Sequence, residues 1–391
     1  MDVMKESLVF HKKYGGKVGT HLKADIVDKE VLGLAYTPGV AEPCKEIYLD
    51  KDKVYDYTWK KNTIAVVSDG TAVLGLGDIG PQAALPVMEG KCNLLKKFGD
   101  VDAVPIVLDT KDPEEIISIV KAIAPTFGGI NLEDISAPRC VEIERRLINE
   151  LDIPVFHDDQ HGTAIVVAAG IINSLKLVGK DPSTCTAVVS GTGAAGNSII
   201  RMLNKLGIGE IYGFNSRGII IREDADKYNF LEKELMEITN YSNKRLSLEE
   251  AMKEADIFVG VSARDVLNKQ MVSSMKEKSI VFALANPIPE ISYDDAKEAG
   301  AYIVGTGRSD KPNQVNNILA FPGLFRGALD CRASKITEDM KLAAAVGLAS
   351  LVTDEKLNQE YVIPDAFDER VSQMVAKEVI RVANESKISR I

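Results

Sequence analysis

The chain has 391 residues, and a composition of 45% hydrophobic and 27% charged residues excludes wholesale disorder. Lys and Arg number 47 against 57 Asp and Glu, and the formal charge of −10 argues against nucleic acid or an anionic membrane as the main partner. No apolar run approaches the roughly 20 residues of a membrane span. No secretory signal opens the sequence, and the five scattered cysteines do not suit a disulfide framework. We therefore expect a cytoplasmic protein that binds neither nucleic acid nor membrane.

The first sixty residues contain few strand-like runs and are expected to form helices and loops attached to the first sheet. From Lys61 onward, short apolar runs alternate with segments of helical length. Continuous runs of this kind are typical of parallel strands that are buried on both faces. After Lys335 the sequence predicts only helices. The predicted strands are 63–68, 103–108, 129–132, 153–157, 186–190, 211–214, 256–261, 279–284 and 301–305.

The pattern G-x-G-x-x-G occurs twice. In the first copy, Gly75 to Gly80, the carboxylate of Asp78 would repel a pyrophosphate, so we interpret this copy as a tight loop before a helix. The second copy follows a predicted strand and opens a predicted helix. Its glycines permit a tight turn, close approach of the backbone to a pyrophosphate and close packing of helix on strand. The predicted dinucleotide-binding residues are Gly191, Thr192, Gly193, Ala194, Ala195 and Gly196.

The alternation of strands and helices predicts an α/β fold with right-handed crossovers. We place a domain boundary near residue 160, where one strand–helix series ends and the strand–glycine–helix unit begins. The expected domains are an N-terminal α/β domain over residues 1–160 and a Rossmann-like domain over residues 161–391. The second domain is expected to have a doubly wound parallel sheet followed by C-terminal helices.

The end of the next strand bears on which dinucleotide binds. Where an NAD site commonly has an acid for the ribose 2′-hydroxyl, this chain has Asn215, Ser216 and Arg217. An amide, a hydroxyl and a guanidinium with no carboxylate beside them suit a 2′-phosphate, so the sequence favours NADP over NAD. The alternative is that Arg217 is a solvated loop cation.

Two pairs of acids follow predicted strands: Glu133 with Asp134, and Asp158 with Asp159. Ligands gather at the carboxyl ends of strands in open α/β sheets, and crowded carboxylates select Mg²⁺ or Mn²⁺ over zinc. The alternative is that each pair caps the helix that follows it. Lys91, taken by itself, is typical of a lysine at the edge of an apolar core.

Several segments between about residue 11 and residue 330 carry a joint resemblance. They are Tyr36-Thr37-Pro38-Gly39-Val40-Ala41, Gly75-Leu76-Gly77-Asp78, Gly90-Lys91, Gly129-Ile130-Asn131-Leu132-Glu133-Asp134-Ile135, Phe156-His157-Asp158-Asp159-Gln160-His161-Gly162-Thr163-Ala164, Ala285-Asn286-Pro287, Asn316-Asn317 and Phe321-Pro322-Gly323. In this order they resemble a malic enzyme of the small prokaryotic type. The resemblance implies oxidative decarboxylation of (S)-malate to pyruvate and CO₂, reduction of NAD(P)⁺, a divalent metal and a homodimer.

The resemblance also implies roles for particular residues. Lys91 would take the proton from the C2 hydroxyl of malate, and Tyr36 would protonate C3 of the enolate. Because the base must be neutral, burial and the charge of the metal are expected to lower the pKa of Lys91. Of the remaining site residues, Asp158 would lie beside the lysine, Asn286 and Asn317 would hold the substrate, Asn286 would also contact the cofactor, and the metal ligands would be Glu133, Asp134 and Asp159.

One departure from the family pattern concerns the substrate carboxylate. Larger eukaryotic relatives carry an arginine just before the Leu-Gly-Leu-Gly-Asp segment, whereas this chain has Asp69-Gly70-Thr71-Ala72-Val73 there. Arg139 and backbone N–H groups are the candidates to replace that arginine. Two other functions stay open from the residues. One is an amino-acid dehydrogenase, which needs no metal, and the other is a non-catalytic nucleotide-binding protein.

Overall fold

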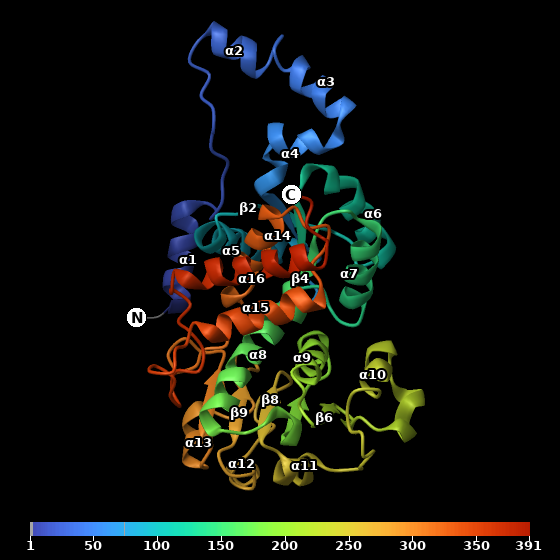
Figure 1. Ribbon diagram of the computed structural model, residues 1–391, viewed down its shortest axis with the longest axis vertical. Coiled ribbons are helices and arrows are strands. Elements are labelled where there is room, and N and C mark those ends of the chain that lie inside the picture. The colour runs from blue at the N-terminus through green and yellow to red at the C-terminus, as the bar shows by residue number, and fades with distance from the viewer. Residues whose placement is uncertain (1–2, 74) are drawn as a thin grey trace.

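The predicted apolar runs form two sheets, one in each half of the chain (Figure 1). The computed structural model describes residues 3–73 and 75–391. The first sheet has the strand order β2-β1-β3-β4, and all of its strands are parallel. Its strands are β1 (Thr63–Ser68), β2 (Asp102–Val107), β3 (Gly129–Leu132) and β4 (Val155–His157).

Successive residues of β1 face opposite sides of the first sheet, and helices cover both sides. Ala65 and Val67 share a core with α6 (Pro113–Ile123) and α7 (Arg139–Glu150). Ile64 and Val66 share another core with α5 (Pro81–Gly99) and α14 (Phe321–Asp330). Burial on both faces explains why the strand is a continuous apolar run rather than an alternating one.

The second sheet has the strand order β10-β9-β8-β5-β6-β7 and is parallel except for β7, which pairs antiparallel with β6. The strand order reverses between β5 and β8, and ligands of doubly wound sheets bind at such a switch point. The strands are β5 (Thr186–Ser190), β6 (Glu210–Asn215), β7 (Gly218–Ile219), β8 (Ile257–Gly260), β9 (Ile280–Ala283) and β10 (Ile303–Thr306). The helices of this half are α8 (Asp158–Val178), α9 (Ala194–Lys205), α10 (Phe230–Leu235), α11 (Leu248–Glu254), α12 (Lys269–Ser273) and α13 (Tyr293–Glu298).

The C-terminal helices join the two sheets. The helix α14 packs on α5, α15 (Glu338–Ser350) packs on α8, and α16 (Arg370–Glu385) packs on both α14 and α15. One apolar core therefore runs from the first sheet through these helices to the second sheet. The prediction of helix throughout this region is wrong for residues 351–369, which form turns. Short 3₁₀ turns lie at Lys51–Lys53, Trp59–Asn62, Ala124–Thr126, Pro182–Thr184, Arg222–Lys227 and Asn317–Leu319.

The helix α8 begins at Asp158 and runs through the expected domain boundary near residue 160. Its 21 residues are long and apolar enough to cross a membrane, which corrects the expectation that no apolar run approaches that length. Most of the apolar part of this helix is buried inside the protein, between the second sheet and α15. Its composition is therefore that of a central core helix.

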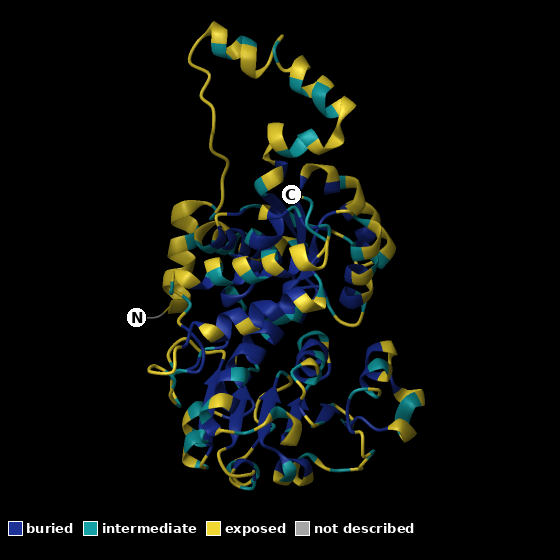
Figure 2. Cartoon of the chain, in the orientation of Figure 1, coloured by how far each residue is buried: buried dark blue, intermediate teal, exposed yellow. Residues whose placement is uncertain are grey.

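The N-terminal segment departs most from prediction. Residues 18–58, which we call the arm, carry α2 (Lys29–Ala35), α3 (Ala41–Leu49) and α4 (Val54–Tyr57), and α2 and α3 project away from both sheets (Figure 1). The preceding helix, α1 (Val3–Tyr14), lies beside the body of the molecule. None of the described residues from 3 to 58 is buried (Figure 2). The expectation that these helices attach to the first sheet is therefore wrong for α2 and α3, whereas Lys23 at the start of the arm pairs with Asp102 of β2.

The junction between β5 and α9 needs glycine at two positions. Gly191 has a φ of 101°, in the region that favours glycine, and a Cβ there would lie 2.7 Å from the Val261 carbonyl oxygen. A Cβ on Gly196 would overlap the carbonyl oxygen of Gly191. A Cβ on Gly193, by contrast, would meet nothing within 4 Å. The first glycine pattern, Gly75 to Gly80, forms a loop before α5, as predicted.

This contrast predicts different effects of two neighbouring substitutions. Gly196→Ala should destabilise the fold by about 1–3 kcal/mol, because backbone at the strand–helix junction must move to admit the methyl group. Gly193→Ala, the matched control, should change the free energy of unfolding by less than about 1 kcal/mol. Urea unfolding of both variants measures the difference. Equal stabilities would show that the junction tolerates a side chain at residue 196.

Candidate active site

Charged side chains from three elements meet at the carboxyl edge of the first sheet. Glu133 follows β3, Asp158 follows β4 at the start of α8, and Lys91 reaches both from α5. The Nζ of Lys91 lies 2.6 Å from Asp158 Oδ2 and 2.8 Å from Glu133 Oε1. All three side chains are at most 8% exposed. Lys91 is therefore a buried, doubly ion-paired amine and not an ordinary lysine at the edge of a core.

The surroundings of Lys91 hold it in the charged form. Burial lowers the pKa of Lys91, but the charges of Asp158, Glu133 and Asp159 outweigh burial and raise the pKa above its usual value. The ring of Phe321, with its centroid 4.2 Å from Nζ, stabilises the same cation. The residues of this chain alone therefore raise the pKa of Lys91, and the expected lowering, which also counts the charge of a bound metal, stays a prediction.

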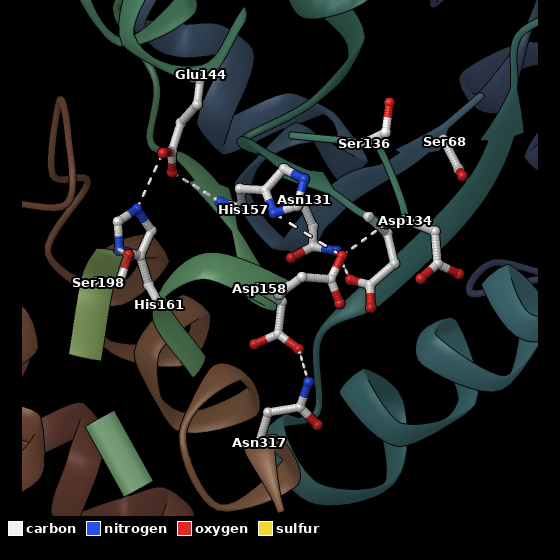
Figure 3. A network of polar contacts seen from close by, with 12 residues as sticks. Ser68, Asn131, Asp134, Ser136, Glu144, His157, Asp158, His161, Ser198 and Asn317 are labelled. Carbon is white, nitrogen blue, oxygen red and sulfur yellow. Dashed lines mark hydrogen bonds and ion pairs between the residues drawn. The ribbon is translucent and has the colours of Figure 1, made fainter. Parts of the chain in front are cut away.

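Asp158 links the lysine to the second half of the chain. Its side chain is fully buried, and Oδ2 accepts hydrogen bonds from Lys91 and from the side-chain amide of Asn317 (Figure 3). Burial raises the pKa of Asp158 to about 7, although the charge of Lys91 acts in the opposite direction. Asn317 is thus placed beside the ion pair, as a substrate-holding residue would need to be.

Glu133, Asp134 and Asp159 form a cluster whose potential ligand oxygens all lie within 4.8 Å of one another. The backbone N–H of Asp134 donates to Asp159 Oδ2 over 2.7 Å, whereas Asp134 Oδ2 is buried without a hydrogen-bond partner among the described residues. Burial and neighbouring acids raise the pKa of Asp134 to about 9 and that of Glu133 to about 7, and burial raises the pKa of Asp159 to about 6. Crowded, buried oxygens with an unused acceptor fit a hard divalent cation such as Mg²⁺ or Mn²⁺.

The alternative interpretation of the acid pairs as helix caps is wrong. The N-cap of α7 is Pro138 and that of α8 is His157, and neither makes a side-chain capping bond. Asp158 and Asp159 lie inside the first turn of α8. The Asp158 side chain contacts Asn317 (Figure 3), and Asp159 Oδ2 accepts the backbone N–H of Asp134 after β3. The pairs are therefore free to serve a site.

A cavity of about 480 Å³ brings the separate motifs together. It is lined by residues from both halves of the chain, at the carboxyl ends of their sheets. Two acids of the cluster, the start of α9 and two asparagine side chains thus line one cavity. The predicted site residues that line the cavity are Asp134, Asp159, Ala194, Ala195, Asn286 and Asn317.

A second cavity, of about 590 Å³, lies along the other side of the 191–196 loop. Gly191 and Gly193 line it together with Asn215 and Ser216 at the end of β6. Since β5 and β6 are adjacent parallel strands, this cavity occupies the place of the adenosine ribose in a Rossmann site. Most of the predicted cofactor residues therefore line two cavities that share Ala137 and Ser262 in their walls.

The interpretation that no carboxylate faces the end of β6 is wrong. Glu232 of α10 lines the same cavity, accepts a hydrogen bond from the Asn215 amide over 2.7 Å and pairs with Arg217 Nη2 over 2.8 Å. The Arg217 side chain is 50% exposed, so it is neither buried nor a free loop cation. The sequence could not show this acid, because the contact depends on α10 folding over the strand end.

Tyr36 does not reach the cavity. It ends α2 in the arm and is 68% exposed. Figure 1 shows α2 far from α5, which carries Lys91. The tyrosine and the lysine of the expected catalytic pair therefore do not meet within one chain.

Arg139, one candidate for binding a substrate carboxylate, is engaged elsewhere. Its Nη2 lies 2.7 Å from Asp69 Oδ2 and 2.5 Å from Thr71 Oγ1, and its Nε donates to Ser136. These bonds hold the loop after β1 against the loop after β3. Arg139 thus shapes the loops beside the acids but does not line the 480 Å³ cavity.

Glu144 of α7 holds the end of β4 in place, and the sequence did not predict a role for it. It accepts the backbone N–H of His157 over 2.8 Å and faces His161 Nε2 at 2.9 Å, while His161 Nδ1 lies 3.3 Å from the Ser198 hydroxyl in α9 (Figure 3). Burial would raise the pKa of Glu144, but its interactions with His161, Lys341 and His157 lower the pKa to about 2. This chain of contacts fixes the end of β4 relative to the dinucleotide helix.

Glu290 supports the opposite wall in the same way. Its buried carboxylate accepts the backbone N–H of Ser262 over 2.8 Å and that of Ala285 over 3.0 Å. Ser262 and Ala285 both line the 480 Å³ cavity. One acid therefore holds together the loops that follow β8 and β9, and no sequence motif marks it.

Two family models match the chain in succession. The model described as the malic enzyme N-terminal domain matches residues 16–148, and that of the malic enzyme NAD binding domain matches residues 160–384. A bifunctional malic/malolactic enzyme of Bacillus subtilis is 54% identical over 100% of this chain and 95% of its own length. An NAD-dependent malic enzyme of Geobacillus stearothermophilus is 53% identical over 96% of this chain and 78% of its own.

Solved structures agree. The NAD-dependent malic enzyme of Thermotoga maritima superposes with a TM-score of 0.92 at 48% identity, over 96% of this chain and 98% of that chain. A malic enzyme of Pyrococcus horikoshii gives 0.95 at 48% identity, over 99% and 92%. The chain therefore belongs to the malic enzyme family, NAD- or NADP-dependent enzymes that share the oxidative decarboxylation of malate.

Proposed function

We propose that the chain converts (S)-malate to pyruvate and CO₂ with reduction of a nicotinamide dinucleotide and with a divalent metal. The observation that carries this proposal is the 480 Å³ cavity, where the acid cluster, the start of α9 and two amides meet. Malate presents a hydroxyl, a hydride at C2 and two carboxylates. Acid oxygens and amides line the cavity, and one of them, the Asn317 amide, is bonded to Asp158 of the Lys91–Asp158 pair.

In this proposal Lys91 takes the proton of the C2 hydroxyl while hydride leaves C2 for the nicotinamide. Asp158, 2.6 Å from Nζ, is placed to accept the proton that Lys91 must lose before it can act as a base. Its pKa of about 7 suits exchange of protons near neutral pH. Asn286 and Asn317 line the cavity and would hold the carboxylates by their amide groups.

Glu133, Asp134 and Asp159 are the residues that would hold Mg²⁺ or Mn²⁺. The unpartnered Asp134 Oδ2 and the raised pKa values of the three acids support this assignment, because a dication offsets the repulsion among buried carboxylates. When bound, such an ion supplies a Lewis acid beside the oxygens of the substrate.

The activity is tested by mixing protein, malate and NAD⁺ or NADP⁺ with Mn²⁺, with and without a chelator. We expect reduced nicotinamide and pyruvate in equal amounts, and loss of both with the chelator. Turnover of an amino acid without metal would support the dehydrogenase alternative, and binding without turnover would support a non-catalytic protein. Because the Bacillus subtilis relative is named a malic/malolactic enzyme, lactate is measured alongside pyruvate.

Removal of one proposed metal ligand tests the assignment of the metal site. Asp159→Ala should weaken Mn²⁺ binding and abolish malate oxidation, because the cluster loses one of its three carboxylates. The matched control is Asp109→Ala, since Asp109 follows β2 on the same sheet edge but is exposed and outside the cluster. Titration calorimetry with Mn²⁺ measures both variants. Unchanged affinity in Asp159→Ala would remove this residue from the ligand set.

We also propose that the enzyme is a homodimer in which the arm of each chain completes the site of the other. Within one chain the arm exposes large apolar side chains, among them Leu22 at 79%, Leu34 at 71% and Tyr48 at 87%. Exposed apolar surface of this extent marks a site of protein contact. Delivery of Tyr36 of the partner subunit to the cavity would explain why Tyr36 lies far from Lys91 in its own chain.

Mixed dimers test the exchange of arms. Tyr36→Phe should slow turnover by roughly 10²–10⁴-fold, the effect of losing a general acid, and Lys91→Ala should abolish it. Dimers that combine one chain of each variant restore one complete site only if Tyr36 acts across the interface. Equal mixing should then recover about one quarter of wild-type activity, since half of the dimers are mixed.

Tagged chains and size-exclusion chromatography verify that mixed dimers form. Mixed dimers with no recovered activity would place Tyr36 and Lys91 of one chain in the same site and contradict the exchange. Full activity of Tyr36→Phe alone would remove Tyr36 from the mechanism.

The division into residues 1–160 and 161–391, the cytoplasmic location and the absence of nucleic-acid and membrane partners stay part of this proposal. The net charge of −10 supports the last of these.

A further inference from the structure

The carboxylate of Glu232 occupies an unusual place for a helix-capping residue. As the third residue of α10 it accepts the backbone N–H of Asn229 over 3.1 Å, which completes a capping box. Its side chain is only 8% exposed, and the same carboxylate also binds the Asn215 amide and the Arg217 guanidinium. A capping box requires only the first of these three bonds. The other two aim a buried charge at the end of β6.

That position matters because of what lies next to it. Glu232 lines the 590 Å³ cavity with Gly191, Gly193 and Asn215. In Rossmann sites the acid at the end of the second strand accepts the ribose 2′-hydroxyl. Here the strand end supplies an amide, and the carboxylate arrives from a helix that starts 15 residues after Asn215 in the sequence.

We propose that Glu232 selects NAD⁺ over NADP⁺, in place of the NADP preference that Asn215, Ser216 and Arg217 suggest when considered without it. One acceptor site of Glu232 Oε1 is left for a ribose hydroxyl, because the Asn215 amide is its only bonded partner among the described residues. A 2′-phosphate would meet the negative charge of Glu232 and find Arg217 already neutralised by it.

This inference rests on the proposed function for the identity of the reaction, but its test does not need turnover. AMP and adenosine 2′,5′-bisphosphate represent the adenosine halves of NAD⁺ and NADP⁺, and titration calorimetry measures both without malate or metal. The wild-type protein should bind AMP at least about ten-fold more tightly, a difference of about 1.4 kcal/mol. Tighter binding of the bisphosphate by the wild-type protein would overturn the proposal, whatever the malate assay gives.

Glu232→Gln keeps the shape and the capping bond but removes the charge. It should shift the ratio of the two affinities toward the bisphosphate by about ten-fold or more, because Arg217 is then free to pair with the phosphate. The matched control is Glu237→Gln, which removes a nearby charge that has no side-chain bond to Asn215 or Arg217 in the described structure. An unchanged ratio in a folded Glu232→Gln protein would overturn the proposal.

A double variant tests whether the effect passes through Arg217. If Glu232 acts by neutralising the guanidinium, the gain in bisphosphate affinity from Glu232→Gln should be smaller in an Arg217→Ala background. A gain of the same size in both backgrounds would assign the whole effect to direct repulsion, which still supports selection by Glu232. If Glu232→Gln instead weakened AMP and bisphosphate binding by the same factor, the substitution would have damaged the cavity in general, and a specific role of Glu232 would be contradicted.

Discussion

The structure depends on crowding four carboxylates and one amine together, with the amine and three of the carboxylates buried and Asp159 partly exposed. Glu133, Asp134, Asp158 and Asp159 are each costly to bury, and the single cation of Lys91 does not balance them. The protein tolerates the imbalance through neutral donors, such as the Asn131 amide on Glu133, and through raised pKa values among the acids. The site is therefore built with a deficit of positive charge, which a metal ion and protons can make up.

Three charged side chains near this site hold loops together. Arg139 ties the loop after β1 to the loop after β3, Glu144 ties the end of β4 to α9, and Glu290 ties the loops after β8 and β9. Each of these three side chains bonds to backbone or to a neighbouring loop, and none of them lines the 480 Å³ cavity. The 480 Å³ cavity is thus surrounded by charged side chains whose bonds hold the loops of both halves in place.

The sequence predicted the strands because strands buried on both faces must be continuous apolar runs, and it predicted the acids because they follow those runs directly. It could not predict Glu232, whose contact with Arg217 depends on the path of α10. Nor could it predict the exposed arm, because local pattern does not say whether a helix packs on its own chain. The rise in the pKa of Lys91 could not be predicted from the sequence either, because Asp158, Glu133 and Asp159 come close to the amine only in the folded chain.

The return of the C-terminal helices to the first sheet has a consequence for how the protein denatures. The helix α14 packs on α5 and places Phe321 over Lys91, while α15 and α16 bind α14 to the central helix α8. Neither half of the chain can lose its packing without exposing the apolar core of the other. The two halves are therefore expected to melt together in one cooperative transition. A fragment that stops before α14 would lack a helix that covers one face of its first sheet.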